Sequence, residues 1–97
     1  MYSTTDIFSK KEFSELQVNH LIRSENCEVL SISLEAGSVF PEHTSPKDSH
    51  ILVLEGAIDF NIRDEIHHLK AYQAMDFEAN TKHHVKAHAN SRFLIIR

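Results

Sequence analysis

The chain has 97 residues, of which 41% are hydrophobic and 25% charged, which is enough for one domain with a single small core. It carries 10 basic and 14 acidic side chains, for a formal net charge of −4. This balance excludes the basic stripe that phosphate backbones require, so we expect no nucleic-acid partner.

Cys27 is the only cysteine, which excludes an intrachain disulfide and fits a reducing compartment. The longest aliphatic runs, ILVL and LII, are far shorter than the roughly 18–20 residues of a membrane span. The N-terminal stretch lacks the apolar segment of a signal peptide. We therefore expect a cytoplasmic protein with no membrane partner.

The first predicted element is a short helix over residues 9–16. Ser9 can cap it, Glu12 occupies the reciprocal position of a capping box, and Phe8 and Phe13 are spaced for a hydrophobic staple. Alternation typical of β-strands begins soon afterwards, so the helix should be short.

Short strand-like segments then follow one another along the rest of the chain, at a spacing of roughly ten residues. They cover residues 18–23, 27–34, 38–45, 50–56, 57–63, 66–72, 75–79, 83–89 and 92–97. The segments between them are too short for helical crossovers, so the strands should pair antiparallel. The sequence predicts an all-β sandwich or barrel, closed or nearly closed.

Two of these segments show their buried face clearly. Residues 30, 32 and 34 are aliphatic and alternate with Ser31 and Ser33, which predicts one buried and one solvated face. Residues 58, 60 and 62 alternate in the same way with polar positions. Asp64–Glu65 is the candidate tight turn after this second strand.

Two stretches of the chain resemble the motifs of a small single-domain cupin. They are GSVFPEHTSPKDSHILVLEG, residues 37–56, and YQAMDFEANTKHHVKA, residues 72–87. The resemblance spans about residues 35–87 and implies that residues 1–97 form one cupin domain, a double-stranded β-helix or jelly-roll barrel. Full-pattern cupins read G-x5-H-x-H, three or four residues, E-x6-G, and then G-x5-P-x-G-x2-H-x3-N. In those proteins the three histidines and the glutamate hold a divalent metal.

The first motif is only partly present. Gly37 and Gly56 match its two glycines, and His43 matches its first histidine. Ser45 stands where the second histidine belongs, and Ser49 stands where the glutamate belongs.

The second motif is also incomplete. His83 matches its histidine, whereas Tyr72, Glu78 and Ala87 replace a glycine, the proline and the asparagine. Asn80 takes the other glycine position, which is reasonable because Asn tolerates a positive φ better than most residues. The resemblance therefore implies two of the four metal ligands, His43 and His83.

Strand parity supports an inward orientation for both of these histidines. His83 and Val85 share the face opposite Lys86, which belongs in water, so they should point into the barrel. By the same count His43 and Ser45 share a face. The predicted ligand pocket comprises His43, Ser45, Ser49, His83 and Val85.

His50 remains open between two placements. Counting puts Ser49 inward and His50 outward, but a bulge in residues 46–49 would reverse this. With His50 inward, three imidazoles would supply the protein ligands of a zinc, iron, nickel or manganese centre. Without it, a divalent metal would be held loosely or not at all, and hydrogen bonds would satisfy the two remaining histidines.

Three functions follow from this reading, and the catalytic residues stay unknown. The chain could bind a small polar ligand, with or without a loosely held metal. It could be a metal-dependent enzyme of the dioxygenase or isomerase type. It could also be a non-catalytic interaction or regulatory barrel. We expect a homodimer, with Phe8 and Phe13 as a candidate clasp.

Overall fold

The computed structural model describes residues 2–6 and 12–97, and all regular elements in that part of the chain are strands. None of the described residues belongs to a helix that could span a membrane. The strands are β1 (Leu16–Arg23), β2 (Glu28–Leu34), β3 (Val39–His43), β4 (Ser49–Glu55), β5 (Ala57–Ile62), β6 (Glu65–Lys70), β7 (Ala74–Phe77), β8 (His83–Ala87) and β9 (Ser91–Ile96). The all-β prediction is confirmed.

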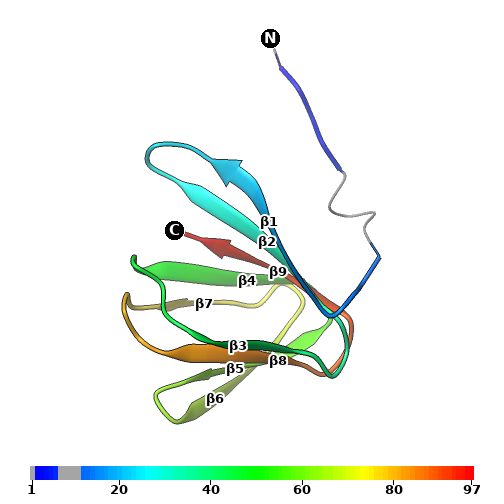
Figure 1. The fold of residues 1–97 in the computed structure, drawn as a ribbon, viewed down its shortest axis with the longest axis vertical. Coiled ribbons are helices and arrows are strands. Elements are labelled where there is room, and N and C mark those ends of the chain that lie inside the picture. The colour runs from blue at the N-terminus through cyan, green and yellow to red at the C-terminus, as the bar shows by residue number, and fades with distance from the viewer. Residues whose placement is uncertain (1, 7–11) are drawn as a thin grey trace.

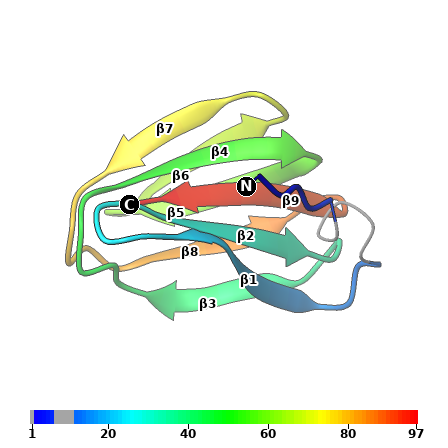
Figure 2. The same ribbon diagram turned by 90° about the horizontal axis from the view of Figure 1, so that it is seen from above.

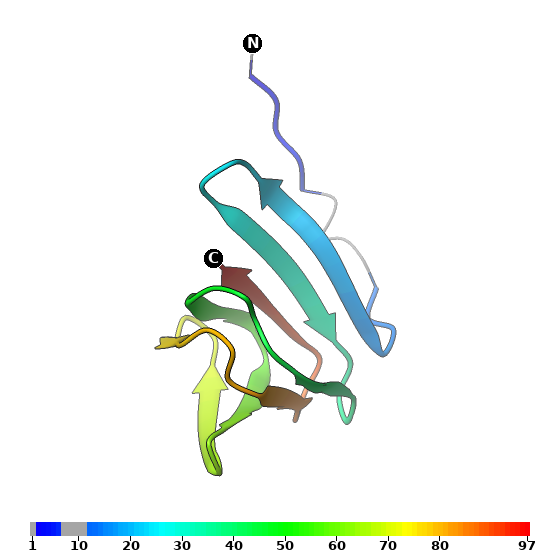
Figure 3. The same cartoon turned by 60° about the vertical axis from the view of Figure 1, so that its left-hand side comes forward.

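The strands form two antiparallel sheets. The five-stranded sheet has the order β1-β2-β9-β4-β7, and the four-stranded sheet has the order β3-β8-β5-β6. They stack as two layers (Figures 1 and 3), and β9 lies between β2 and β4 in the larger layer (Figure 2). Neighbours in each sheet are mostly distant in sequence, which is the arrangement of a jelly-roll barrel.

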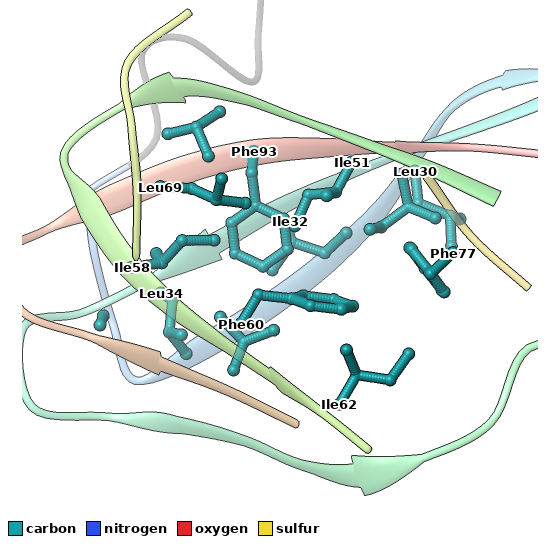
Figure 4. Packing of buried hydrophobic residues seen from close by; sticks show 14 residues of the cluster. Leu30, Ile32, Leu34, Ile51, Ile58, Phe60, Ile62, Leu69, Phe77 and Phe93 are labelled. Atoms are coloured by element: carbon teal, nitrogen blue, oxygen red, sulfur yellow. The ribbon is translucent and has the colours of Figure 1, made fainter. Parts of the chain in front are cut away.

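The core fills the space between the two sheets. Phe60 of β5 and Phe93 of β9 are fully buried, one from each layer, and aliphatic side chains surround them (Figure 4). The predicted inward positions Ile58, Phe60 and Ile62 are all buried. The period-two pattern of β5 is therefore a correct guide to its core face.

The described part of the predicted helix over residues 9–16, which is residues 12–16, is not helical. Residues 9–11 and Phe8 lie outside the described residues, residues 12–14 have no regular secondary structure, and Leu16 begins β1. The Glu15 N–H donates to Glu35 Oε1 at 3.1 Å, and the Glu35 N–H donates to the Glu15 carbonyl at 2.8 Å. Pairing with the end of β2 therefore outweighs the local capping signal.

The outer face of β2 differs from its prediction as well. Ser31 and Ser33 are buried although they point away from the core. Thr5 and Asp6 line a cavity together with Ser31, and the Phe13 ring lies 4.3 Å from the guanidinium of Arg92, which is the cross-strand partner of Ser33. Thr5, Asp6 and Phe13 therefore lie over this face, which strand alternation alone does not reveal.

The β5–β6 turn lies one residue earlier than predicted. Arg63 and Asp64 have φ values of 52° and 62°, and Ile62 pairs with Glu65. Two successive positive φ values are typical of the type I′ turn that matches the twist of a two-residue hairpin. This register places Asp59 of β5 directly opposite His68 of β6.

Candidate functional site

The backbone supports the motif alignment at each position that the cupin pattern gives to glycine. Gly37 and Gly56 have φ values of 84° and 86°, and Tyr72 and Asn80, which replace glycines, have φ values of 69° and 62°. The left-handed conformation is therefore kept where the glycine is not. The expectation that Asn80 adopts a positive φ is confirmed.

His43 and His83 meet at one mouth of the barrel. They are cross-strand partners of β3 and β8, and their rings lie edge to face with centroids 4.3 Å apart. Phe40 stacks on His43 at 4.2 Å, and Phe77 lies 4.7 Å from His83. His83 is only 3% exposed. The predicted inward orientation of His83 is confirmed, and His43 lies beside it.

Hydrogen bonds to backbone carbonyls indicate which ring nitrogen of His43 and of His83 can accept a hydrogen bond from a ligand. His43 Nδ1 lies 2.6 Å from the Pro41 carbonyl oxygen, and His83 Nδ1 lies 2.8 Å from the Thr81 carbonyl oxygen. A carbonyl oxygen can only accept, so each Nδ1 carries the proton. The Nε2 of each neutral ring is then an acceptor.

A small cavity of about 200 Å³ adjoins the two rings. Both sheets contribute to it, since Leu30 and Ile32 belong to β2 of the larger sheet and His43 and His83 to β3 and β8 of the smaller one. Its polar lining comprises His43, Thr44, Ser45, His83 and Arg97, and its apolar lining comprises Leu30, Ile32, Phe40, Phe77 and Ile95. Sequence reasoning missed Arg97, which follows the last strand and carries the only charge among the lining residues other than the imidazoles.

The guanidinium of Arg97 is held from two sides. Its Nε donates to Glu28 Oε1 at 2.8 Å, and one terminal nitrogen donates to Ser45 Oγ at 3.1 Å. The hydrogen bond from Arg97 lowers the pKa of Glu28, so this carboxylate is ionised at neutral pH. The Arg97 backbone is also paired with Glu28 in both directions. A fixed cation therefore faces the cavity.

The two serines that stand at positions of metal ligands in the motif are bonded to each other. The hydroxyl oxygens of Ser45 and Ser49 lie 3.1 Å apart, and they lie 3.0 and 2.9 Å from the Lys47 carbonyl oxygen. Both serines are buried. Ser49 and Val85 are buried but do not line the cavity, so only three of the five predicted pocket residues do.

The structure decides between the two placements that the sequence leaves open for His50, and the tentative inclusion of His50 among the metal ligands is wrong. Ser49 and Ile51 are buried, whereas His50 is exposed on the other face of β4. Its cross-strand partners are Asp76 of β7 and Ile96 of β9. The direct count of strand parity, which put Ser49 inward and His50 outward, is therefore correct.

The interior does not fit a tightly held metal ion. Two imidazoles supply one ligand fewer than the three that a catalytic centre of zinc or iron takes from the protein. The two positions that would complete the set hold hydroxyls that are engaged with each other, and Arg97 also donates to the hydroxyl of Ser45. The set of metal ligands inside the barrel is therefore incomplete.

Burial sets the charge state of His83. Desolvation lowers its pKa, and the neighbouring imidazoles of His43 and His84 lower it further, although the hydrogen bond to Thr81 acts in the opposite direction. His83 is therefore neutral at neutral pH. Its role toward a ligand would be to accept a hydrogen bond rather than to attract an anion.

A second group of side chains lies on the outer face of the four-stranded sheet. Asp59 of β5, His68 of β6 and His88, which follows β8, place one ligand atom each within 4.8 Å of one another. This is a candidate metal-binding group. None of the sequence patterns described above singles out Asp59, His68 or His88.

The comparisons with known proteins agree with this architecture. The family model described as Cupin domain matches residues 30–96. No curated protein sequence matches the chain significantly.

Several solved structures share the fold. An RmlC-like cupin protein from Desulfovibrio desulfuricans superposes with a TM-score of 0.86 at 21% identity, covering 99% of this chain and 95% of that one. A conserved protein of unknown function from Streptococcus pyogenes gives 0.82 at 18% identity, with 99% and 86% covered. An RmlC-like cupin with a double-stranded β-helix fold from Methanocaldococcus jannaschii gives 0.78 at 22% identity, with 91% and 84% covered. With the domain match over residues 30–96 and the left-handed backbone at each motif glycine position, the chain belongs to the cupin family.

Proposed function

We propose that the chain is a binding module for a small organic acid that also carries a hydroxyl group, held in the cavity between His43, His83 and Arg97. The observation that carries the proposal is the pairing of one fixed guanidinium with two imidazoles in one cavity. The guanidinium of Arg97 supplies donors for a carboxylate. The imidazole Nε2 atoms supply acceptors for a hydroxyl.

The size and walls of the cavity limit the ligand. A volume of about 200 Å³ corresponds to roughly six or seven water-sized groups. The walls formed by Leu30, Ile32, Phe40 and Ile95 favour a short carbon chain between the two polar ends. A 2-hydroxy acid of three to five carbons satisfies both conditions.

The test is a titration of isotope-labelled protein with lactate, propionate and lactamide, followed by NMR shifts of residues around the cavity. We expect lactate to bind at least about tenfold more tightly than propionate, which lacks the hydroxyl, and than lactamide, which lacks the charge. Arg97→Met should abolish the lactate shifts, whereas Arg63→Met, which breaks an exposed ion pair with Glu78, should preserve them. Equal binding of all three compounds, or none, to the folded protein would refute the proposal for this class.

The metal-dependent enzyme remains the alternative reading. It gains support if protein purified without chelator or affinity tag contains a stoichiometric metal that both His43→Ala and His83→Ala remove. Metal retained in those two variants would lie elsewhere on the chain.

We also propose that the chain forms a homodimer. β1 is an edge strand of the larger sheet, and its Val18 and Ile22 side chains are about half exposed. Pairing at this edge would bury both side chains and satisfy the open backbone groups. Phe13 packs on Arg92 of the same chain, so we do not assign it to the proposed dimer interface. Sedimentation that shows only monomer at tens of micromolar would contradict the dimer.

A further inference from the structure

We propose that Asp59, His68 and His88 form a binding site for a divalent transition-metal ion on the outside of the barrel. The site is separate from the cavity and does not depend on the ligand proposed there, because none of the three residues lines the cavity. Asp59 on β5 and His68 on β6 lie on the face of the sheet opposite Phe60, and His88 follows the end of β8. These strands lie together in the lower part of Figure 1.

The sheet ladder fixes the relative positions of the three residues. Asp59 is the direct cross-strand partner of His68 on β6 and of Lys86 on β8. His88 lies two positions beyond Lys86, on the same face, and its N–H donates to the Ala57 carbonyl at 3.0 Å. Two ligands therefore lie on adjacent strands, and the third follows the end of β8, where its backbone N–H is bonded to β5. Placement on regular strands is more rigid than placement on loops.

The carboxylate of Asp59 contacts the imidazoles of both His68 and His88. Its Oδ1 contacts His68 Nδ1, and its Oδ2 lies 2.6 Å from His88 Nε2. Asp59 is only 14% exposed, against 73% for His68 and 51% for His88. Partial burial raises the pKa of Asp59, but the hydrogen bonds from His88 and His68 lower it overall, so it is ionised at neutral pH.

This donor set suits zinc and its neighbours in the first transition row. Imidazole nitrogen and carboxylate oxygen are ligands of zinc, copper and nickel, whereas calcium and magnesium prefer oxygen alone. A tetrahedral zinc ion with bonds of about 2.1 Å holds its ligand atoms about 3.4 Å apart. The three atoms lie within 4.8 Å, so changes in side-chain torsion can bring them to an ion without moving a strand.

Metal binding would replace the two hydrogen bonds by metal–ligand bonds. The proton on each imidazole nitrogen that now faces Asp59 moves to the other nitrogen of the same ring, which leaves a neutral imidazole with its lone pair on the metal. The carboxylate contributes its charge without any proton change. One coordination position then stays open to water, because the two histidines are largely exposed.

The test is calorimetric titration of the full chain with Zn²⁺ alone, after chelator treatment and tag removal. We expect one ion per chain, and a loss of affinity of at least about tenfold in His68→Gln and in Asp59→Asn. His68→Gln should fold normally because the side chain is mostly exposed, so it keeps the test valid if the less exposed Asp59 variant does not fold.

Two matched controls define the site. His50→Ala removes an exposed histidine from the other sheet and should leave the affinity unchanged. Lys86→Gln removes a positive charge directly opposite Asp59 without removing a ligand, so it should bind Zn²⁺ at least as tightly as the wild type.

The contrary outcomes are clear. Wild-type affinity in His68→Gln would overturn the inference, as would the absence of Zn²⁺ binding to the wild type. Loss of binding in His43→Ala and His83→Ala with the exterior variants unaffected would place the ion in the cavity and overturn it too. In that case the ligand proposal for the cavity would also fail, whereas loss confined to the exterior variants leaves the cavity proposal untouched.

Discussion

His43 and His83 face each other across the β3–β8 ladder, with ring centroids 4.3 Å apart and each Nδ1 bonded to a backbone carbonyl. This arrangement orients both rings through the backbone and leaves the Nε2 atoms as acceptors. It is the same device by which proteins orient metal-binding histidines. Here serines occupy the other two ligand positions of the motif, and the guanidinium of Arg97 lines the same cavity.

The first prediction concerns the pH dependence of stability through His83. Burial is the main cause that lowers the pKa of His83 in the folded state. Below the ordinary value of 6.5, the unfolded chain therefore binds a proton at His83 more readily than the folded chain does. The stabilisation is complete above pH 6.5 and is lost as the pH falls from 6.5 through the folded pKa. Urea unfolding at pH 7.5 and 5.5 should show a larger loss in the wild type than in His83→Gln.

His43→Gln serves as the comparison for this measurement, because it removes the neighbouring imidazole. A loss between pH 7.5 and 5.5 that is the same in the wild type and in His83→Gln would contradict the role assigned to His83.

The second prediction is that Tyr72→Gly stabilises the fold. Tyr72 has a φ of 69° and is 84% exposed, so it bears left-handed strain and loses little packing when it is removed. Relief of that strain, about 1–2 kcal/mol, exceeds the extra entropy cost of glycine, and a net gain of about 0.5–1 kcal/mol is expected. Denaturant unfolding measures it. Tyr72→Ala, which removes the ring but keeps the Cβ, should show no such gain.

The third prediction separates the two motif glycines. A Cβ on Gly56 would lie 2.3 Å from Ser91 Oγ and 2.5 Å from the Asn90 carbonyl oxygen, whereas a Cβ on Gly37 would meet nothing within 4 Å. Gly37→Ala should cost about 1–2 kcal/mol, from backbone strain alone. Gly56→Ala adds a clash with backbone and should cost more than about 3 kcal/mol. Equal losses in thermal or denaturant unfolding would contradict this difference.

The fold and the inward position of His83 could be predicted from the sequence. Side chains alternate along a strand, so the residues that share a face with Lys86 could be assigned to solvent and His83 to the interior. The turn glycines then fixed the motif positions. Arg97 escaped this reasoning because its long side chain reaches Ser45 across 52 residues of sequence.

The exterior group was missed because it depends on register between strands. Placing the β5–β6 turn at Asp64–Glu65 would pair Asp59 with Lys70, whereas the observed turn at Arg63–Asp64 pairs Asp59 with His68. A shift of one residue in the turn moves every cross-strand neighbour by two. No side-chain pattern in the sequence distinguishes the two turns, since both put the same residues outside.

The last prediction restores the interior metal site. Ser45→His with Ser49→Glu, made in a His68→Gln background to silence the exterior group, should give a barrel with four converging ligands including His43 and His83. Ser49 is only 1% exposed, so the new carboxylate is costly without an ion and the metal-free variant should be less stable than its parent.

Zn²⁺ should then raise the melting temperature of this variant far more than that of the parent, because the ion binds the folded state only. Ser45→His alone, which adds a third imidazole without a buried charge, provides the same readout if the double variant does not fold. If Zn²⁺ stabilises neither variant more than the His68→Gln parent, then Ser45 and Ser49 do not occupy the ligand positions that the motif alignment gives them.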